Sequence, residues 1–364
     1  MATGKVQAPP PETTPRSPST ILQRAREPRG LAGSGVVVVL LLFVLLALPS
    51  MLSTYYIDAL TQASIYSIVA LGLAVLVGRV GMVSLGQGAV VAMGAWVAAR
   101  LLFATVLPFP LVLLFTGLIT MVLGTLVGLP ALRMSGLYLA LITLMLAGAI
   151  TVVLASINFP NGGGGFTGYA GGLLHIPPIR RPTIARTAPG FFRYSVVVSI
   201  LMFALVVGHL RTRPGRAWAA IRQSESAALA GGINTTLYKL WAFALASFIT
   251  GVAGGLVAGA DQFLSTLTFQ TQDSIVLLAV VLMGGAYNIW GAVIAGLLYQ
   301  LVPQILNNIG VSSDWLTIIF GIGVLQVLTT APTGIADQLP KDMARLGRLI
   351  MGLGKRAPSG VDTP

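Results

Sequence analysis

The sequence predicts an all-α, polytopic membrane protein with about ten transmembrane helices, and three observations carry this prediction. Hydrophobic residues make up 55% of the 364 positions and charged residues only 9%, whereas soluble domains carry about 25% charged residues. The apolar residues stand in long runs, many of them near the roughly 20 residues that a helix needs to cross a bilayer. These runs are continuous and do not alternate with polar residues, so they favour helices over the strands of a membrane barrel.

The chain divides into a membrane domain and two tails. Residues 1–34 are rich in Pro, Ser, Thr and Arg without apolar periodicity, which predicts a disordered basic cytoplasmic tail. Residues 35–335 form the predicted membrane domain, and residues 336–364 form a second basic cytoplasmic tail. A signal peptide is the alternative for the first apolar run, 35–53. The long preceding tail and the lack of an A-x-A-like cleavage site favour a membrane span there.

Nine further candidate spans follow the first. They cover residues 56–78, 84–107, 109–129, 135–157, 193–210, 236–259, 272–284, 289–307 and 314–331. The run 272–284 is short for a bilayer crossing, so it is expected to be tilted or broken near "MGGAYN". Small residues recur every four positions in the span 236–259, which predicts a face for close helix packing. These residues are Ser247, Gly251, Gly255 and Gly259.

The distribution of basic residues predicts the orientation of the chain. With the N-terminus inside and ten crossings, 17 of the 22 Lys and Arg residues lie on the cytoplasmic side. This distribution obeys the positive-inside rule. Both termini and residues 211–235 are therefore predicted in the cytoplasm, and the Gly/Pro-rich loop 158–192 outside. The net charge of +12 faces the cytoplasmic leaflet, so it does not imply a nucleic-acid partner.

A faint internal repeat relates two glycine-containing stretches, which begin at Ser67 and Ser274. In each stretch a glycine precedes the glycine of a "GAV" triplet by seven positions. Repeats are common in transporter folds. With 43 glycines in the chain, coincidence explains the match as well as duplication does.

Composition excludes several kinds of chemistry. The chain has no cysteine and only two histidines, His175 and His209, which excludes thiol chemistry and argues against a multi-histidine metal site and a membrane enzyme. Ion-coupled transporters keep acidic residues at mid-membrane, whereas Asp58 and Asp273 lie near predicted helix ends. Arg100 also lies near a helix end and is expected to extend to the membrane surface. A secondary transporter is therefore the less favoured alternative.

Charge and alanine gather in "GRAWAAIRQSESAALAGGINTTLYK", residues 215–239. Pro214 and Gly215 end the preceding span, Ser224 can cap a second short helix, and Gly231 and Gly232 end that helix. The segment is predicted to form a compact helical knob at the cytoplasmic surface. The alternative is an amphipathic loop whose arginines lie among lipid headgroups.

This segment resembles the conserved cytoplasmic loop of bacterial ABC-importer permeases, most closely the M-type subunit of the branched-chain amino acid permease family. The stretches "VGRVGMVSLGQGAVVAMGAWVAA", "LPALRMSGLYLALITL" and "LMGGAYNIWGAVIAG" agree with that family in order and spacing, so the resemblance covers roughly residues 55–335. The chain departs from the family at Gln87, where members often carry His, and in the external loop. The matching residues of the knob are Arg222, Glu225, Ala227, Ala228, Gly232 and Ile233.

The resemblance implies that these six residues belong to coupling helices that dock on an ATPase. It implies an ATP-driven importer in a bacterial inner membrane, with a homologous permease subunit, two ATP-binding subunits and an extracytoplasmic solute-binding protein as partners. The implied solute is a branched-chain amino acid, with urea, amides and other small solutes as alternatives. The stretch "GLGKR" at 352–356 is not a phosphate-binding loop. The chain is therefore expected to be no enzyme and to hold no cofactor itself, with ATP bound by the partner subunits.

Polar residues inside the spans are candidates for a translocation path. Ser84 and Gln87 follow a glycine-rich break, where freed backbone groups can meet a zwitterion. Hydrogen bonding to neighbouring helices is the alternative role for such residues. The complete candidate set is Ser84, Gln87, Thr143 and Asn288.

Overall fold

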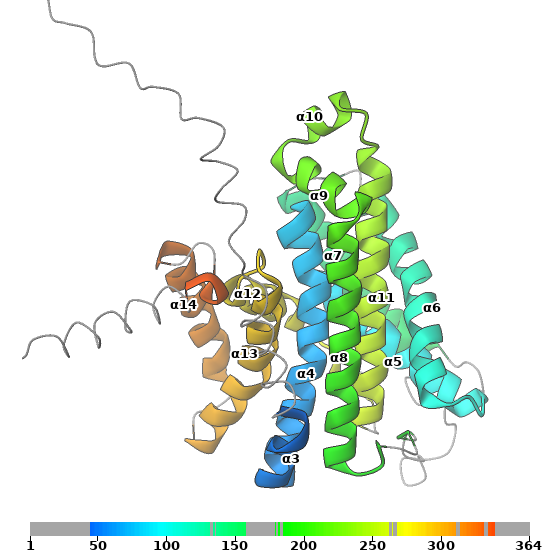
Figure 1. Ribbon diagram of the computed structural model, residues 1–364, viewed down its shortest axis with the longest axis vertical. Coiled ribbons are helices and arrows are strands. Elements are labelled where there is room, and N and C mark those ends of the chain that lie inside the picture. The colour runs from blue at the N-terminus through cyan, green and yellow to red at the C-terminus, as the bar shows by residue number, and fades with distance from the viewer. Residues whose placement is uncertain are drawn as a thin grey trace, which may run out of the picture. The chain divides into compact units, whose positions relative to one another are not determined.

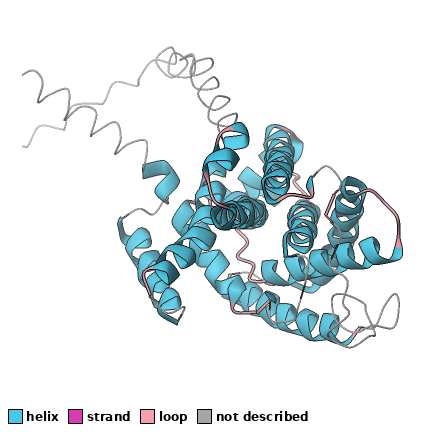
Figure 2. Ribbon diagram, turned by 90° about the horizontal axis from the view of Figure 1, so that it is seen from below, coloured by secondary structure: helices cyan, strands magenta, loops and turns pink. Residues whose placement is uncertain are grey.

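The computed structural model describes residues 44–131, 134, 136–157, 179, 181–182, 185–261, 264, 268–310, 314–330 and 334–338. Within these ranges the regular structure is helical and contains no strand (Figure 2). The tail 1–34, almost all of the tail 336–364 and most of the loop 158–192 predicted outside lie beyond the described residues. The chain separates into two compact units, Met1–Met51 and Leu52–Pro364. The described helix of the first unit is α3 (Leu48–Met51), so most of the predicted span 35–53 also lies outside the description.

The second unit contains every other labelled helix (Figure 1). They are α4 (Thr54–Ala74) with its π-helical continuation η1 (Val75–Val80), α5 (Gln87–Ala104), α6 (Phe109–Ala131), α7 (Leu137–Ser156), α8 (Ala188–Arg211), α9 (Arg213–Gln223), α10 (Glu225–Ala230), α11 (Thr235–Asp261), α12 (Asp273–Gly284), α13 (Ile289–Asn308) and α14 (Asp314–Thr330). Among the described residues, 7 helical segments are long and apolar enough to cross a membrane. The helices match the predicted spans from 56 to 331, and the all-α polytopic fold is confirmed.

Helix α8 begins five residues before the predicted span at 193, because polar capping residues start it and not the apolar run. The Thr187 hydroxyl accepts a hydrogen bond from the Gly190 N–H at 3.3 Å, and Pro189 stands in the first turn, where its missing N–H costs nothing.

Helix α11 is the centre of the bundle, and its row of small residues packs on two neighbours. A Cβ on Gly251 would clash with Thr120 of α6, and one on Gly94 of α5 would lie 2.5 Å from the Gly251 carbonyl oxygen. A Cβ on Gly255 would lie 2.7 Å from Leu113 of α6. The predicted packing face is therefore confirmed, since only small residues allow the backbones to approach this closely.

Helix α4 packs along α11, and α8 packs on α4 (Figure 1). The Gln62 amide near the start of α4 donates to Asp261 at the end of α11, at 2.5 Å, whereas Gly72 packs against Ala246. These contacts make α4 antiparallel to α11. Helix α8 runs parallel to α4, and its Ser199 hydroxyl donates to the Ser64 carbonyl at 3.1 Å.

Arg100 does not extend to the membrane surface as expected. Its side chain is buried at 4% exposure. The guanidinium lies 5.4 Å from the ring centroid of Trp96 and donates to the Ile157 carbonyl at 3.3 Å. The aromatic face and the carbonyl at the end of α7 supply polar partners inside the protein, so the charge has no need to reach solvent.

Candidate functional site

Two short helices, α9 and α10, project together at one end of the bundle (Figure 1). Ser224 caps α10 by accepting a hydrogen bond from the Ala227 N–H at 3.3 Å. Gly232 ends the segment with φ of 78°, a left-handed conformation that favours glycine. The following Ile233 N–H donates to the Ala228 carbonyl at 3.0 Å, and the Asn234 side chain caps α11 through the Leu237 N–H at 3.0 Å. The two short helices predicted in this segment are confirmed.

One face of α9 packs against the membrane domain. Trp218 is fully buried at 0% exposure, and its indole N–H donates to the Tyr238 carbonyl in the first turn of α11, at 2.8 Å. Ala217 and Ile221 are buried on the same face. Burial of a large aromatic side chain together with a satisfied indole N–H makes α9 a rigid attachment and not a loose interfacial loop.

Arg222 lies against two breaks in the transmembrane helices. Its guanidinium donates a hydrogen bond to the Gly78 carbonyl in η1 and lies 4.2 Å from the ring centroid of Tyr287, between α12 and α13. The two breaks also touch each other, because a Cβ on Gly78 would lie 2.6 Å from the Ala286 carbonyl carbon. A single side chain of α9 therefore contacts the point where η1 crosses the α12–α13 break.

The other predicted coupling residues shape the knob in different ways. Ala228 is 5% exposed and packs inward, and Ile233 packs against the core. Glu225 forms an ion pair with Lys239 of α11 at 2.6 Å, which ties the start of α10 to the bundle. Of the remaining residues, Gly232 forms the turn and Arg222 hydrogen-bonds to the Gly78 carbonyl. Ala227 is exposed on α10.

The sequence reasoning missed Leu229. This side chain is 55% exposed on α10, beside Ser226 and Ala227, which are also exposed. The sequence signal that could have identified Leu229 as a surface residue of interest is a large apolar side chain between small residues in a charged segment. The outer face of α10, formed by Ser226, Ala227, Leu229 and Ala230, is thus the surface of the knob that faces away from the bundle.

Two helices begin inside the bundle and not at its ends. The Gln87 side chain at the start of α5 accepts a hydrogen bond from Thr250 at 2.8 Å, and Thr250 lies near the middle of α11. The Gly88 N–H of α5 donates to the Ser274 hydroxyl in the first turn of α12 at 3.2 Å. With 12 residues, α12 rises about 18 Å and is shorter than the roughly 30 Å hydrocarbon core. The prediction of a short, broken segment at 272–284 is therefore confirmed.

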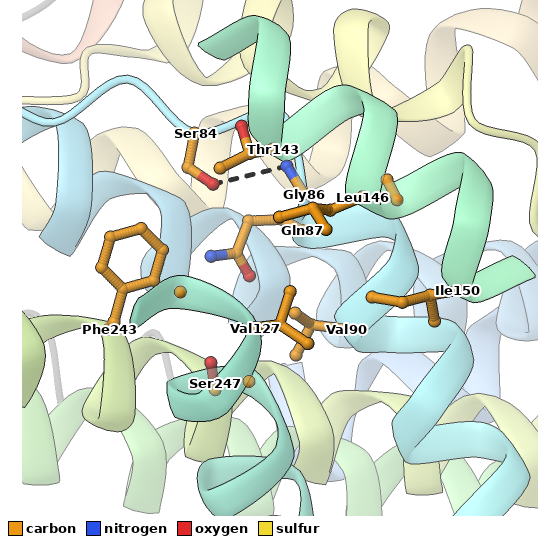
Figure 3. A pocket seen from close by; sticks show the side chains of 13 residues that line it. Ser84, Gly86, Gln87, Val90, Val127, Thr143, Leu146, Ile150, Phe243 and Ser247 are labelled. Carbon is orange, nitrogen blue, oxygen red and sulfur yellow. Dashed lines mark hydrogen bonds between the residues drawn. The ribbon is translucent and has the colours of Figure 1, made fainter. Parts of the chain in front are cut away.

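Residues 81–86 connect η1 to α5 without helical structure, and they help to enclose a small cavity (Figure 3). Ser84, Gln87 and Thr143 all line it, and its volume is about 30 Å³. The Thr143 hydroxyl accepts from the Leu85 N–H at 2.9 Å and donates to the Ala140 carbonyl at 2.9 Å. These bonds satisfy part of the backbone that the break leaves without helical partners.

The cavity wall is mostly apolar. Figure 3 shows Phe243 and Ile150 at its edge, and Val90, Val127 and Leu146 also line it. A space of this size has room for water molecules only. The cavity is therefore lined by an apolar wall and four polar side chains (Ser84, Gln87, Thr143 and Ser247), and it is closed to anything as large as an amino acid.

Asn288, the fourth predicted path residue, lies apart from the cavity. Its side-chain oxygen accepts from the Trp290 N–H at 3.1 Å, and its amide donates to Asp337 at 2.8 Å. Asn288 therefore caps α13 and ties it to residues 334–338. Within the described ranges, no three His, Asp or Glu side chains come together in a way that could hold a metal ion.

Apolar helices broken at glycines enclose a small, mostly apolar cavity, and a helical knob contacts these breaks, an architecture that suits a membrane permease. The sequence agrees: residues 55–328 match the family described as branched-chain amino acid transport system / permease component. The chain belongs to this family, and its members are permease subunits of ABC importers. No solved structure matches the chain.

Curated relatives include permeases for two kinds of solute. The high-affinity branched-chain amino acid transport system permease protein LivM of Escherichia coli K12 is 31% identical, over 74% of this chain and 68% of its own. The LivM protein of Salmonella typhimurium is 30% identical, over 74% of this chain and 67% of its own. The fructose import permease protein FruG of Bifidobacterium longum is 27% identical, over 71% of this chain and 76% of its own.

Proposed function

We propose that this permease imports a branched-chain amino acid and that the outer face of α10 docks on an ATPase subunit. The observation that carries the coupling is the position of Arg222, which bonds to Gly78 and stacks on Tyr287. A displacement of α9 reaches both helix breaks through this one side chain. Trp218 transmits the same displacement to the start of α11.

The proposed movement reaches the cavity through a short stretch of chain. Gly78 precedes Ser84 by only six residues, and residues 81–86 carry Ser84 directly to Gln87 at the start of α5. A shift of η1 therefore changes the position of the residues that line the cavity. Alternating access then requires the ATPase to supply the work, with the helices opening the closed cavity toward one side at a time.

The apolar wall supports an aliphatic amino acid as the solute. An isoleucine or valine side chain can lie against Val127, Leu146 and Ile150, while Ser84, Gln87 and Thr143 offer hydrogen bonds to polar groups of the amino acid. A sugar would place several hydroxyls against the same wall, and each hydroxyl buried without a partner costs about 1–3 kcal/mol. The sugar permeases among the relatives make a sugar the second candidate.

The complete transporter in this proposal contains a homologous permease subunit, two ATP-binding subunits and an extracytoplasmic solute-binding protein. Both termini and the knob then lie in the cytoplasm. In this complex ATP binds to the partner subunits, and this chain supplies the path and the coupling surface.

Ala227→Trp tests the docking surface. The side chain is exposed on α10, so a large ring does not disturb the knob but prevents its entry into a cleft of another protein. Recovery of the ATPase with the affinity-tagged permease should fall at least tenfold, and ATP-dependent leucine uptake in proteoliposomes of the full complex should fall with it. Valine should compete with the leucine uptake of the parent complex, and ribose should not.

The matched control is Leu201→Trp on α8, where the parent side chain is 58% exposed. A tryptophan there faces lipid in the middle of a span and should leave ATPase recovery unchanged. Undiminished recovery with Ala227→Trp would contradict the docking surface. Competition by ribose but not by valine would show that the permease imports a sugar and not a branched-chain amino acid.

A further inference from the structure

A depression of about 620 Å³ lies between η1, the end of α8 and α9. Three arginines line it: Arg79 from η1, and Arg216 and Arg222 from α9. Gly78 and Gly215 line it as well, so the backbone is bare of side chains where the helices approach each other. This space is separate from the cavity at Ser84 and Gln87, and neither the transport path nor the outer face of α10 uses it.

The charge of this depression is not neutralised within the described protein. No acidic residue lines it, and the ion pair found among the described residues, Lys239–Glu225, lies elsewhere. Arg79 and Arg216 make no side-chain hydrogen bond or ion pair in the described part of the chain. Arg222 bonds to the uncharged Gly78 carbonyl and to an aromatic face. Three like charges around one space repel each other, and an anion there would remove that cost.

The three side chains are suited to a phosphate group. A guanidinium presents a planar fork of donors that matches phosphate oxygens and is the preferred group for phosphate recognition. Arg79 stands next to the last residue of the span Thr54–Val80, which places the depression at headgroup depth. Basic pockets between transmembrane helices at the cytoplasmic leaflet bind phosphate-containing lipid headgroups.

We propose that Arg79, Arg216 and Arg222 form a phosphate-binding site occupied by the headgroup of an anionic phospholipid. Its cytoplasmic location rests on the proposed function, but the site itself does not. A bound headgroup bridges η1 and α9 and so holds the knob against the helix break that Arg222 contacts. Free phosphate from the cytosol offers the same chemistry, and the test separates the two sources.

The test compares two double variants that each remove two positive charges from the same end of the bundle. The double variant Arg79→Gln with Arg216→Gln, the depression variant, removes two of the three positive charges that line the depression and keeps Arg222. Arg211→Gln with Arg213→Gln is the matched control, because both residues are exposed and neither lines the depression. Full-length protein in detergent is titrated with monomeric short-chain phosphatidylglycerol, short-chain phosphatidylcholine and inorganic phosphate, and bound lipid is counted by native mass spectrometry.

The parent should bind one phosphatidylglycerol in preference to phosphatidylcholine. Each of the two arginines removed from the depression contributes about a fivefold gain in attraction for an anionic lipid, so the depression variant should bind roughly 25-fold more weakly. The control, whose arginines do not line the depression, should bind less than about threefold more weakly. Inorganic phosphate that binds the parent equally well, and not the depression variant, would support the site and assign it to a soluble anion. Equal binding of the two lipids, or equal losses in both double variants, would overturn the proposal.

A protein partner for the arginines is the remaining outcome. Recovery of the ATPase with the depression variant is therefore measured alongside lipid binding. Loss of ATPase with unchanged phosphatidylglycerol binding would show that the arginines meet acidic residues of the ATPase, and would overturn the lipid site. Loss of lipid binding with unchanged ATPase recovery supports it and leaves the coupling proposal untouched.

Discussion

Replacing Gly78 by alanine tests the contact where η1 crosses the α12–α13 break. A Cβ at residue 78 would lie 2.6 Å from the carbonyl carbon of Ala286, and closer still to its oxygen. Non-bonded carbon atoms lie about 3.5–4.0 Å apart, so one backbone must move by about 1 Å. No side-chain rotation can relieve this clash, because the atoms of Ala286 belong to the main chain. Overpacking of this kind costs about 1–3 kcal/mol of stability.

Gly208→Ala in α8 is the matched control, because a Cβ there meets nothing within 4 Å. Alanine is preferred to glycine inside a helix by about 1 kcal/mol. The two variants should therefore differ by about 2–4 kcal/mol although the chemical change is identical. Heating the full-length protein in detergent and measuring the fraction that remains monodisperse should place Gly78→Ala below the parent and Gly208→Ala at or above it.

The same substitution should disturb coupling, because the Gly78 carbonyl is the acceptor for Arg222. A charge-assisted hydrogen bond contributes about 1.5–3 kcal/mol, and about 1.4 kcal/mol is a factor of ten. In the full complex, solute uptake per ATP hydrolysed should fall about tenfold or more, while ATP hydrolysis continues. Identical unfolding temperatures for the two alanine variants, or normal uptake by Gly78→Ala, would refute the close crossing of the two breaks.

Two further predictions concern the cavity and the orientation. Thr143→Val leaves the Leu85 N–H without its acceptor and should cost about 1–3 kcal/mol in thermal stability; Thr143→Ser keeps the hydroxyl and should not, so equal stabilities would contradict the role of this bond. The chain has no cysteine, so Ala230→Cys and Arg186→Cys each introduce a single thiol. An impermeant reagent applied to spheroplasts should label position 186 and not 230, and the reverse pattern would place the knob outside.

The spans could be predicted from sequence because few backbone conformations are stable in the hydrocarbon core of a bilayer. Backbone groups in lipid must be satisfied within the segment, so an apolar run of sufficient length becomes a helix. The run 109–129 became α6 (Phe109–Ala131) on this ground alone. The early start of α8 depends instead on the local capping signals of Thr187 and Pro189, which lie outside the apolar run.

The knob was predictable for the same local reason. Ser224 and Gly232 act on backbone groups within three to five residues, so their capping and turn chemistry can be recognised without knowing the fold. The roles of the side chains around them were not predictable. Ala228 packs inward and Leu229 outward, and only the docking of α9 onto the bundle decides which face of α10 is free.

Composition and contacts a few residues apart are enough to predict the membrane setting, the order of the helices, the short segment at 272–284 and the helical knob. The site depends on long-range packing. Arg222 and Gly78 are 144 residues apart, and Gln87 and Thr250 are 163 apart. The packing of the helices brings Ser84, Gln87 and Thr143 together around one cavity and places Asn288 elsewhere, at the start of α13. Which polar residues contact each other depends on how the helices pack. Apolar periodicity is a local pattern, so it cannot predict a contact with a residue more than a hundred positions away.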